Sequence, residues 1–224
     1  MGCSGSKGKG GESMGRLSLA NGGKLVVWGD HFNSETRAIL SILEIADVNY
    51  DFRIVNTLED AHKEESYRHV NPSCTVPMIE NGNDKVIGGG VANILYLSGA
   101  CPKVREHLFR DEDRAEIEKL LNWFYMKMRT ETQRLIKLIV PGKVQGGKVA
   151  SQSASQVQSN KEMQINNIFS ENGSLLSVLD GKLKEKRYMA SNELSVADIV
   201  IYTEISTIMA LLSEHHTNDL AHKF

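Results

Sequence analysis

The sequence has few cysteines, little net charge and no long apolar run, and each shortage excludes a class of protein. The three cysteines, Cys3, Cys74 and Cys101, are an odd number at unrelated spacings, so neither a disulfide framework nor a zinc cluster is predicted. The formal net charge of -2 provides no basic surface for nucleic acid, and no nucleic-acid partner is expected. No run approaches the roughly 20 apolar residues that cross a bilayer, so no transmembrane helix is predicted.

The remaining composition is that of a globular protein. With 224 residues, 41% of them hydrophobic and 24% charged, the chain can bury one large or two small cores. The 7 histidines are scattered, and the adjacent pair His215 and His216 has no further ligand at helical spacing, so no metal site is expected. Cysteines without a disulfide pattern fit a reducing compartment, and a cytoplasmic location is the expectation.

Residues 1–23 differ from the rest of the chain because they are rich in glycine and serine and poor in apolar residues. Such a segment cannot bury enough surface to offset its chain entropy, so a flexible tail is predicted. Its first residues match M-G-x-x-x-[ST], which makes Gly2 a candidate for N-myristoylation and Cys3 beside it a candidate for palmitoylation. The motif is short, and an accidental match in a disordered leader is the alternative.

Stable anchoring takes a second signal beside one acyl chain, and the tail offers two. The first is Cys3, and the second is a group of basic side chains suited to an anionic membrane surface, namely Lys7, Lys9, Arg16 and Lys24. We therefore expect the protein to lie on a membrane through its acylated tail, or to belong to a cytoskeletal or other protein assembly.

Residues 24 to about 100 alternate between strand and helix patterns. Short apolar runs predict strands, and apolar residues at helical spacing predict helices. Asn81-Gly82 favours a hairpin turn, and Pro72 prevents the preceding helix from continuing. The predicted order is β-α-β-α-β-β-α, with strands at 24–29, 50–55, 76–79 and 85–87 and helices at 34–46, 58–69 and 90–97.

From Asp111 onward the sequence predicts helices and loops. An acidic start at 111–113 precedes one apolar stripe that includes Leu120, Phe124 and Met128. The polar stretch 145–160 predicts a break, and a helix resumes at 175–183. Ser195 and Asp198 have the S-x-x-D spacing of a reciprocal cap at the start of a buried helix.

Two motifs in the expected order carry a family resemblance. V-P-x-I at 76–79 ends an α/β half, and L-S-V-A-D-I at 194–199 lies in a helical half. Together these two motifs are similar to those of the cytosolic glutathione transferase family, including its theta-like and bacterial members. The resemblance runs from about Lys24 to Leu212. It implies a thioredoxin-like domain over 24–100 and an all-helical domain over 101–224, shortened at its end. Dimerisation is usual in the family, so a homodimer is one implied partner.

The resemblance also implies a site for the thiol peptide glutathione. A hydroxyl after the first strand stabilises the thiolate in that family, and the corresponding position here is Asn33, with Ser34 one place later. Either residue is thus a candidate catalytic group, and the alternative is that it caps the first helix. Helix residues near the pocket mouth, Tyr125, Met126 and Met128, are expected in the core or an interface rather than at the substrate.

The binding part of the implied site is incomplete. A cis bond at Val76-Pro77 would expose the Val76 backbone to an extended peptide. The family's Glu/Gln-Ser pair at the next helix corresponds to Gly89 and Gly90, which retain only backbone donors. Losing two charge-assisted hydrogen bonds would weaken glutathione binding by roughly two to three orders of magnitude.

Two functions follow from these observations. The first is a glutathione-transferase-like protein that has lost catalysis and serves as a binding or scaffold module, with glutathione at most a weak ligand and no cofactor required. The second is a working glutathione transferase that conjugates glutathione to electrophiles, with Ser34 or Asn33 as the thiol stabiliser.

Overall fold

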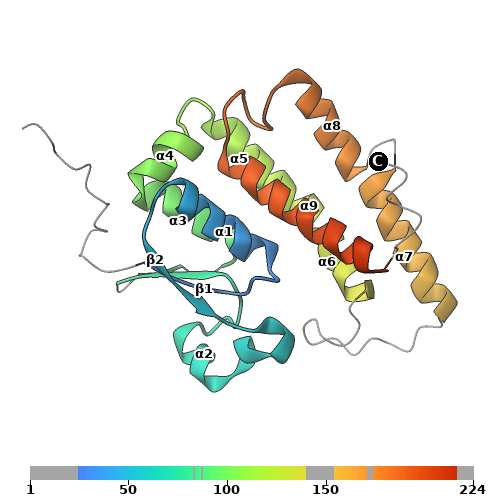
Figure 1. Cartoon of the computed structure of the whole chain (residues 1–224), viewed down its shortest axis with the longest axis horizontal. Helices are drawn as coiled ribbons and strands as arrows, with labels where there is room; N and C mark the ends of the chain where they lie inside the picture. The colour runs from blue at the N-terminus through green and yellow to red at the C-terminus, as the bar shows by residue number, and fades with distance from the viewer. Residues whose placement is uncertain (1–24, 83, 87, 140–153, 171–173, 216–224) are drawn as a thin grey trace, which may run out of the picture.

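The computed structural model describes residues 25–82, 84–86, 88–139, 154–170 and 174–215 (Figure 1). The predicted tail, with Gly2 and Cys3, lies outside the described residues, and so do His216 and residues 140–153. In the described ranges no helix is both long and apolar enough to cross a membrane. The same ranges contain no group of three or more histidine, cysteine or acidic side chains arranged to hold a metal ion.

A four-stranded sheet forms the first half of the molecule, with strand order β2-β1-β3-β4. β1 pairs in parallel with β2 and antiparallel with β3, and β3 pairs antiparallel with β4. Alternate β1 residues are buried, as expected for a strand with one face on a core: Leu25 and Val27 are fully covered. The strands are β1 (Leu25–Gly29), β2 (Tyr50–Ile54), β3 (Met78–Asn81) and β4 (Asp84–Val86).

Helices α1 (Ser34–Ile45) and α3 (Gly90–Ala100) lie together on one side of this sheet, and the α2 segment lies on the other (Figure 1). α1 buries its apolar stripe because Ala38, Ile39, Ile42 and Leu43 recur at helical spacing. The strand and helix order is the one predicted from the sequence.

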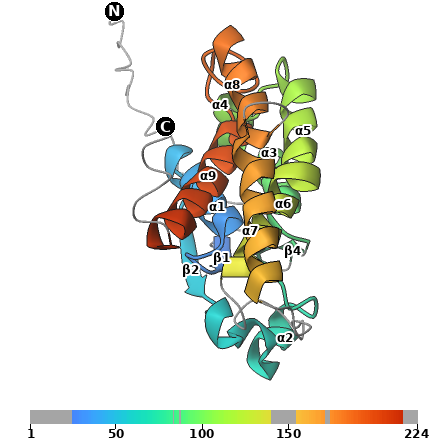
Figure 2. The same cartoon turned by 90° about the vertical axis from the view of Figure 1, so that its right-hand side faces the viewer.

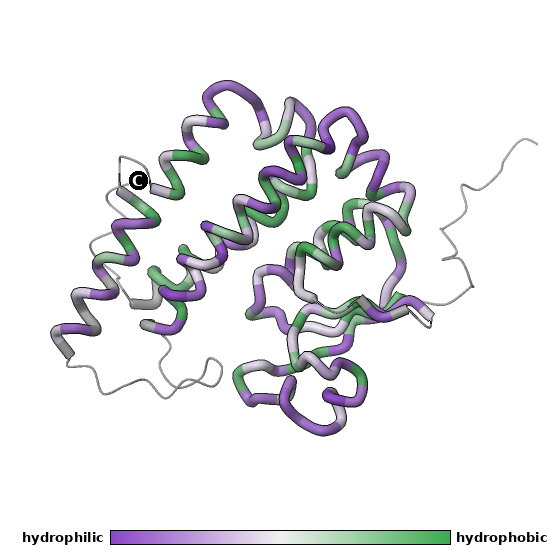
Figure 3. The backbone as a smooth tube through the Cα atoms, turned by 180° about the vertical axis from the view of Figure 1, so that it is seen from behind, coloured by the Kyte–Doolittle hydropathy of each residue, from purple (hydrophilic) through white to green (hydrophobic). Residues whose placement is uncertain are grey.

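One predicted helix, at 58–69, is wrong in extent. The segment consists of two 3-10 turns, η1 (Thr57–Glu59) and η2 (Ala61–Lys63), followed by the short helix α2 (Glu65–Val70). Asp60 separates the two turns in a left-handed conformation, with φ of 61°, and Glu64 is extended with ψ of 150°. Neither conformation continues an α-helix. The segment is mostly hydrophilic (Figure 3), so composition alone did not show these interruptions.

The second half of the described chain is helical, and its long helices run side by side (Figure 2). The predicted break at 145–160 is wrong from residue 154 onward, because a helix begins at Ala154. The helices are α4 (Pro102–Leu108), α5 (Arg114–Trp123), α6 (Arg129–Ile139), α7 (Ala154–Phe169), α8 (Leu175–Glu185) and α9 (Val196–His215).

A π-helical turn, η3 (Phe124–Met128), joins α5 to α6 without a break. The backbone N–H of Arg129 donates to the carbonyl of Phe124, five residues earlier, where an α-helix would use the residue four earlier. The hydroxyl of Thr130 donates to the carbonyl of Met126 at 3.2 Å. Single π-helical turns within α-helices are frequent at functional sites.

Ser195 and Asp198 meet at the start of α9. The Asp198 carboxylate accepts bonds from the Ser195 backbone N–H at 3.0 Å and from the Ser195 hydroxyl at 2.6 Å. Its other oxygen accepts from the backbone N–H of Met189 at 2.7 Å. The Ser195 hydroxyl therefore donates to Asp198, whereas a reciprocal cap would have it accept from the backbone of Asp198.

α9 connects the two halves by packing along α1 (Figure 1). One buried apolar cluster continues from the sheet residue Val27 through Ile39 of α1 to Val200 and Ile208 of α9. The predicted fold class, an α/β thioredoxin-like part followed by an all-helical part, is confirmed. The boundary between residues 100 and 101 remains a prediction.

Candidate functional site

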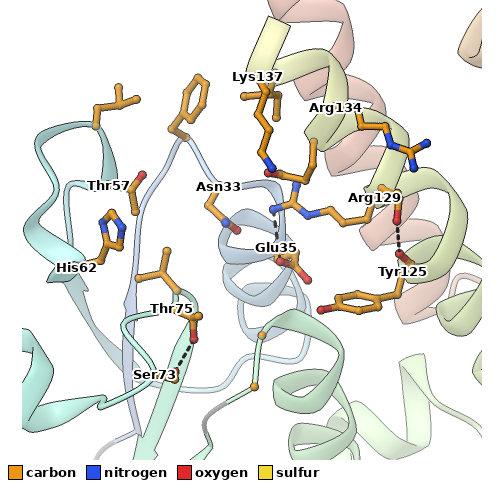
Figure 4. A pocket seen from close by; sticks show the side chains of 18 residues that line it. Asn33, Glu35, Thr57, His62, Ser73, Thr75, Tyr125, Arg129, Arg134 and Lys137 are labelled. Carbon is orange, nitrogen blue, oxygen red and sulfur yellow. Dashed lines mark hydrogen bonds and ion pairs between the residues drawn. The ribbon is translucent and has the colours of Figure 1, made fainter. Parts of the chain in front are cut away.

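A cavity of about 730 Å³ opens between the turn after β1 and helix α6 (Figure 4). Five segments line it: the turn and α1 start, the η1–η2 segment, the loop before β3, the loop before α3, and the η3–α6 face. The fold therefore brings the predicted site residues of the first half opposite a helix of the second half.

Asn33 lines the cavity and is the N-cap of α1. Its side-chain oxygen accepts the backbone N–H of Thr36 at 2.9 Å, which satisfies one donor of the first helical turn. The turn before it is fixed by Asp30, whose carboxylate accepts from the backbone N–H groups of Phe32 at 2.9 Å and Thr57 at 2.8 Å. Only the amide nitrogen of Asn33 remains for a ligand.

Ser34 is not among the residues that line the cavity, and its side chain is 1% exposed. Its hydroxyl donates to Glu204 Oε2 and accepts from Arg129 Nη1 at 2.9 Å. A hydroxyl has a single proton, and that of Ser34 is directed to a carboxylate. In this arrangement the group has no proton to offer to a thiolate.

Two hydrogen bonds from the α2 segment and the residue after it hold the loop before β3 in place. The Val76-Pro77 bond is cis, and Val76 lines the cavity with Thr75. The carbonyl of Thr75 accepts from Asn71 Nδ2 at 2.7 Å and from the Tyr67 hydroxyl at 2.7 Å. These bonds fix the edge along which an extended peptide is predicted to lie.

The glycines at the start of α3, Gly88, Gly89 and Gly90, are required by two different constraints. Gly88 and Gly89 have φ of 139° and 86°, conformations that strain any residue with a side chain. At Gly90 the constraint is space, because an added Cβ would lie 2.6 Å from Glu35 Oε1 and 2.7 Å from Glu35 Cβ. The backbone N–H of Gly90 donates to that same Oε1 at 3.1 Å. The Glu35 side chain thus occupies the space that a residue-90 side chain would take.

A buried ionic cluster consists of Glu35 and Arg129, which line the cavity, and Glu204, which lies behind them. Arg129 Nη1 lies 3.1 Å from Glu204 Oε2, and Nη2 lies 3.4 Å from Glu35 Oε2. Burial raises the pKa of the Glu35 carboxyl, and the Arg129 guanidinium opposes that rise. Burial alone would lower the pKa of Arg129, but the two carboxylates hold it above its usual value.

His62 lines the cavity from η2, with 2% of its surface exposed. Neither ring nitrogen has a hydrogen-bond partner among the described residues. Burial lowers the pKa of this imidazole. Sequence reasoning missed His62, Glu35 and Arg129, and no local motif marks any of them.

Tyr125 also lines the cavity, which corrects the expectation that it belongs to the core or an interface. Met128 is fully buried, as expected, and Met126 is 62% exposed. Within η3, Phe124 and Met128 are thus the buried residues, and Tyr125 and Met126 are exposed.

Comparisons with known proteins agree with this architecture. Residues 112–215 match the family model described as glutathione S-transferase, C-terminal domain. Glutathione S-transferase T1 of Arabidopsis thaliana is 23% identical over 190 residues, which cover 84% of this chain and 74% of that protein. Glutathione S-transferase T3 of the same plant is also 23% identical, over 192 residues and 84% of this chain, but the match spans 31% of its length.

Among solved structures, a glutathione transferase homologue from Drosophila mojavensis with bound glutathione has a TM-score of 0.65 and 22% identity. The match covers 84% of this chain and 78% of that one, and at this identity it concerns the fold. The family model matches the helical half, whereas a theta-1 glutathione S-transferase of Bos taurus, 25% identical over 181 residues, covers 79% of this chain and so aligns across both halves. The chain is thus similar in fold and in sequence to cytosolic glutathione S-transferases, at 23% identity to the T1 relative.

Proposed function

We propose that this protein is a glutathione-transferase-like binding protein that has lost catalysis. The Ser34 hydroxyl carries the proposal: it is covered, donates to Glu204 and accepts from Arg129. A thiol-activating hydroxyl must face the ligand and retain its proton for the sulfur. The start of α1 therefore presents no hydroxyl to the cavity at the position where the family is expected to activate the thiol.

The glycines at the start of α3 support the same proposal. Gly89 and Gly90 supply backbone groups alone, and the Gly90 N–H already has the Glu35 carboxylate as its partner. A ligand carboxylate at this place would compete with Glu35 and meet its negative charge. Glutathione is accordingly proposed as a weak ligand.

A working transferase is the second candidate. Asn33 favours it, because this residue lines the cavity and its amide nitrogen could donate to a thiolate. The relatives named above are described as glutathione S-transferases, so the same activity is the natural alternative.

Activity and binding measured together distinguish the two candidates. We expect no conjugation of 1-chloro-2,4-dinitrobenzene above the uncatalysed rate at millimolar glutathione, and calorimetric binding weaker than about 0.1 mM. Turnover that is lost in Asn33→Ala but retained in Ser34→Ala would establish the transferase. Binding tighter than about 0.1 mM without turnover would keep the loss of catalysis but contradict the weak site.

The sequence of the tail suggests where such a binding protein works. We propose that Gly2 and Cys3 are acylated and hold the protein on a membrane or in a protein assembly, where it acts as a scaffold. We also propose a second copy of this chain as a partner, which would form a homodimer. One myristoyl chain gives marginal binding, so the second acyl group or the basic residues would make the attachment stable.

Mass spectrometry of the native N-terminus tests the anchor. We expect a mass increase of one myristoyl group on Gly2 after removal of Met1, and loss of membrane co-sedimentation in Gly2→Ala. Cys3→Ser should reduce co-sedimentation while leaving myristoylation intact. Retained Met1, or an unmodified Gly2, would remove the membrane hypothesis and leave the assembly as the remaining location.

A further inference from the structure

The inner end of the cavity is formed by an acidic side chain of the protein itself. Glu35 reaches from α1 to the first residue of α3, where its Oε1 accepts the Gly90 N–H at 3.1 Å. Its side chain is 9% exposed and belongs to the cavity lining. The positive end of the α3 dipole is therefore already matched by a carboxylate of the chain.

The Glu35 carboxylate shares the Arg129 guanidinium with a second carboxylate, that of Glu204. Arg129 contacts both Glu35 and Glu204, and the Glu204 side chain is 0% exposed. The nearby Arg37 directs its guanidinium to the carbonyls of His31 at 2.7 Å and Thr203 at 2.9 Å. Arg37 lies near enough to Glu204 to interact electrostatically, which leaves Glu35 as the less compensated acid at the cavity wall.

The other parts of the cavity carry hydrogen-bonding and basic side chains. His62 is buried, and both of its ring nitrogens lack a partner among the described residues. Arg134 and Lys137 lie along the α6 side, as Figure 4 shows, and each is exposed. Glu35, which shares Arg129 with the buried Glu204, thus faces basic and hydrogen-bonding groups elsewhere in one cavity.

We propose that this cavity selects a ligand with a primary amine at its inner end, beside Glu35, and rejects a carboxylate there. An ammonium group would give Glu35 a second cation, whereas a carboxylate would meet an existing negative charge in a partly desolvated place. His62 and the α6 cations would receive the acidic or carbonyl end of the same ligand. The inference rests on the proposed function only in taking this cavity as a binding site.

Two analogues of glutathione isolate the selected group. γ-Aminobutyryl-cysteinylglycine keeps the amine and lacks the adjacent carboxylate, and glutaryl-cysteinylglycine keeps that carboxylate and lacks the amine. By calorimetry on the full chain, we expect the aminobutyryl peptide to bind at least about tenfold more tightly than the glutaryl peptide. Equal affinities, a reversed order, or no binding of either peptide at 10 mM (about the weakest measurable range) would overturn the inference.

Variants assign the selectivity to Glu35. In Glu35→Gln the ratio of the two affinities should fall to within about threefold, because the negative charge is gone while an amide oxygen can still accept the Gly90 N–H. Glu44→Gln is the matched control, since Glu44 lies on the same helix, is exposed and bonds Tyr50. An unchanged ratio in Glu35→Gln would show that another group selects the ligand.

A double variant keeps the test decisive if Glu35→Gln folds poorly. Glu35→Ala with Gly90→Ser removes the side chain that fills the space beside Gly90 and puts a hydroxyl donor there. The order of the two peptides should then reverse. Conjugation of an electrophile by the unaltered protein would refute the loss of catalysis and leave this selectivity standing, so the two proposals fail separately.

Discussion

Replacing Arg129 by methionine is expected to lower the free energy of unfolding by about 3 to 5 kcal/mol. The change leaves Glu35 and Glu204 without the guanidinium that contacts both at 3.1 to 3.4 Å. It also removes a donor to the Ser34 hydroxyl at 2.9 Å. Uncompensated buried charge is among the most destabilising consequences of a single substitution, and chemical denaturation monitored by circular dichroism measures it.

The control for this variant lies one turn further along α6. Arg134 pairs with Glu131 at 2.6 Å, but its side chain is 57% exposed, so Arg134→Met should cost no more than about 1 kcal/mol. Similar losses in the two variants would mean that the buried cluster contributes little.

The Arg129→Met loss should also depend on pH. Because burial raises the pKa of Glu35 in the folded protein, the folded state binds this proton more readily than the unfolded chain, and the stability that Glu35 contributes is lost as the pH rises above about 4.5. Without Arg129 the rise in pKa is larger. The loss in free energy of unfolding caused by Arg129→Met should therefore be smaller near pH 4.5 than at pH 7.

Replacing Asp198 by alanine is expected to cost about 2 to 4 kcal/mol, the second large effect. Its carboxylate accepts three hydrogen bonds, two from Ser195 and one from the backbone of Met189. Ser195 is 0% exposed and Met189 is 4% exposed, so water does not readily replace the lost acceptor. Two buried backbone N–H groups would remain unsatisfied at the start of the helix that joins the two halves.

Two variants separate this effect from a general loss of charge. Ser195→Ala removes one hydroxyl and retains both backbone bonds, so its cost should be about 1 kcal/mol. Asp180→Ala removes an exposed carboxylate that pairs with Lys184 on α8, and should cost less than that. A cost for Asp198→Ala no larger than that of Asp180→Ala would contradict a capping role.

Local pattern predicted the strands and most helices because each depends on nearby residues. Alternation in β1, helical spacing in α1 and the Asn81-Gly82 turn are properties of a few adjacent side chains. The segment at 58–69 was less predictable, because a left-handed Asp60 divides it and no sequence signal required that conformation. The α7 start was missed for a related reason: its first residues are polar, and its place against α6 is a tertiary contact.

The candidate site was less predictable than the fold. Sequence reasoning pointed to the turn of Asn33 and Ser34, which borders the cavity, but it could not tell which of the two side chains lines that cavity. That depends on Arg129 and Glu204, which lie 95 and 170 residues away. Glu35 was missed for the same reason, since its role follows from contacts with Gly90, 55 residues further on.

The π-helical turn η3 has a consequence for the alignment of this chain with its relatives. An α-helix advances about 100° per residue, so the wider turn at Phe124–Met128 changes the rotational phase of every later residue of α6. Arg129, the first residue after the turn, contacts Glu35, Ser34 and Glu204 in that phase. A relative whose helix lacks the turn would present a neighbouring position to the cavity. Residues of α6 should therefore be matched to those of relatives by the side of the helix on which they lie in the superposed structures, and not by their position in a sequence alignment.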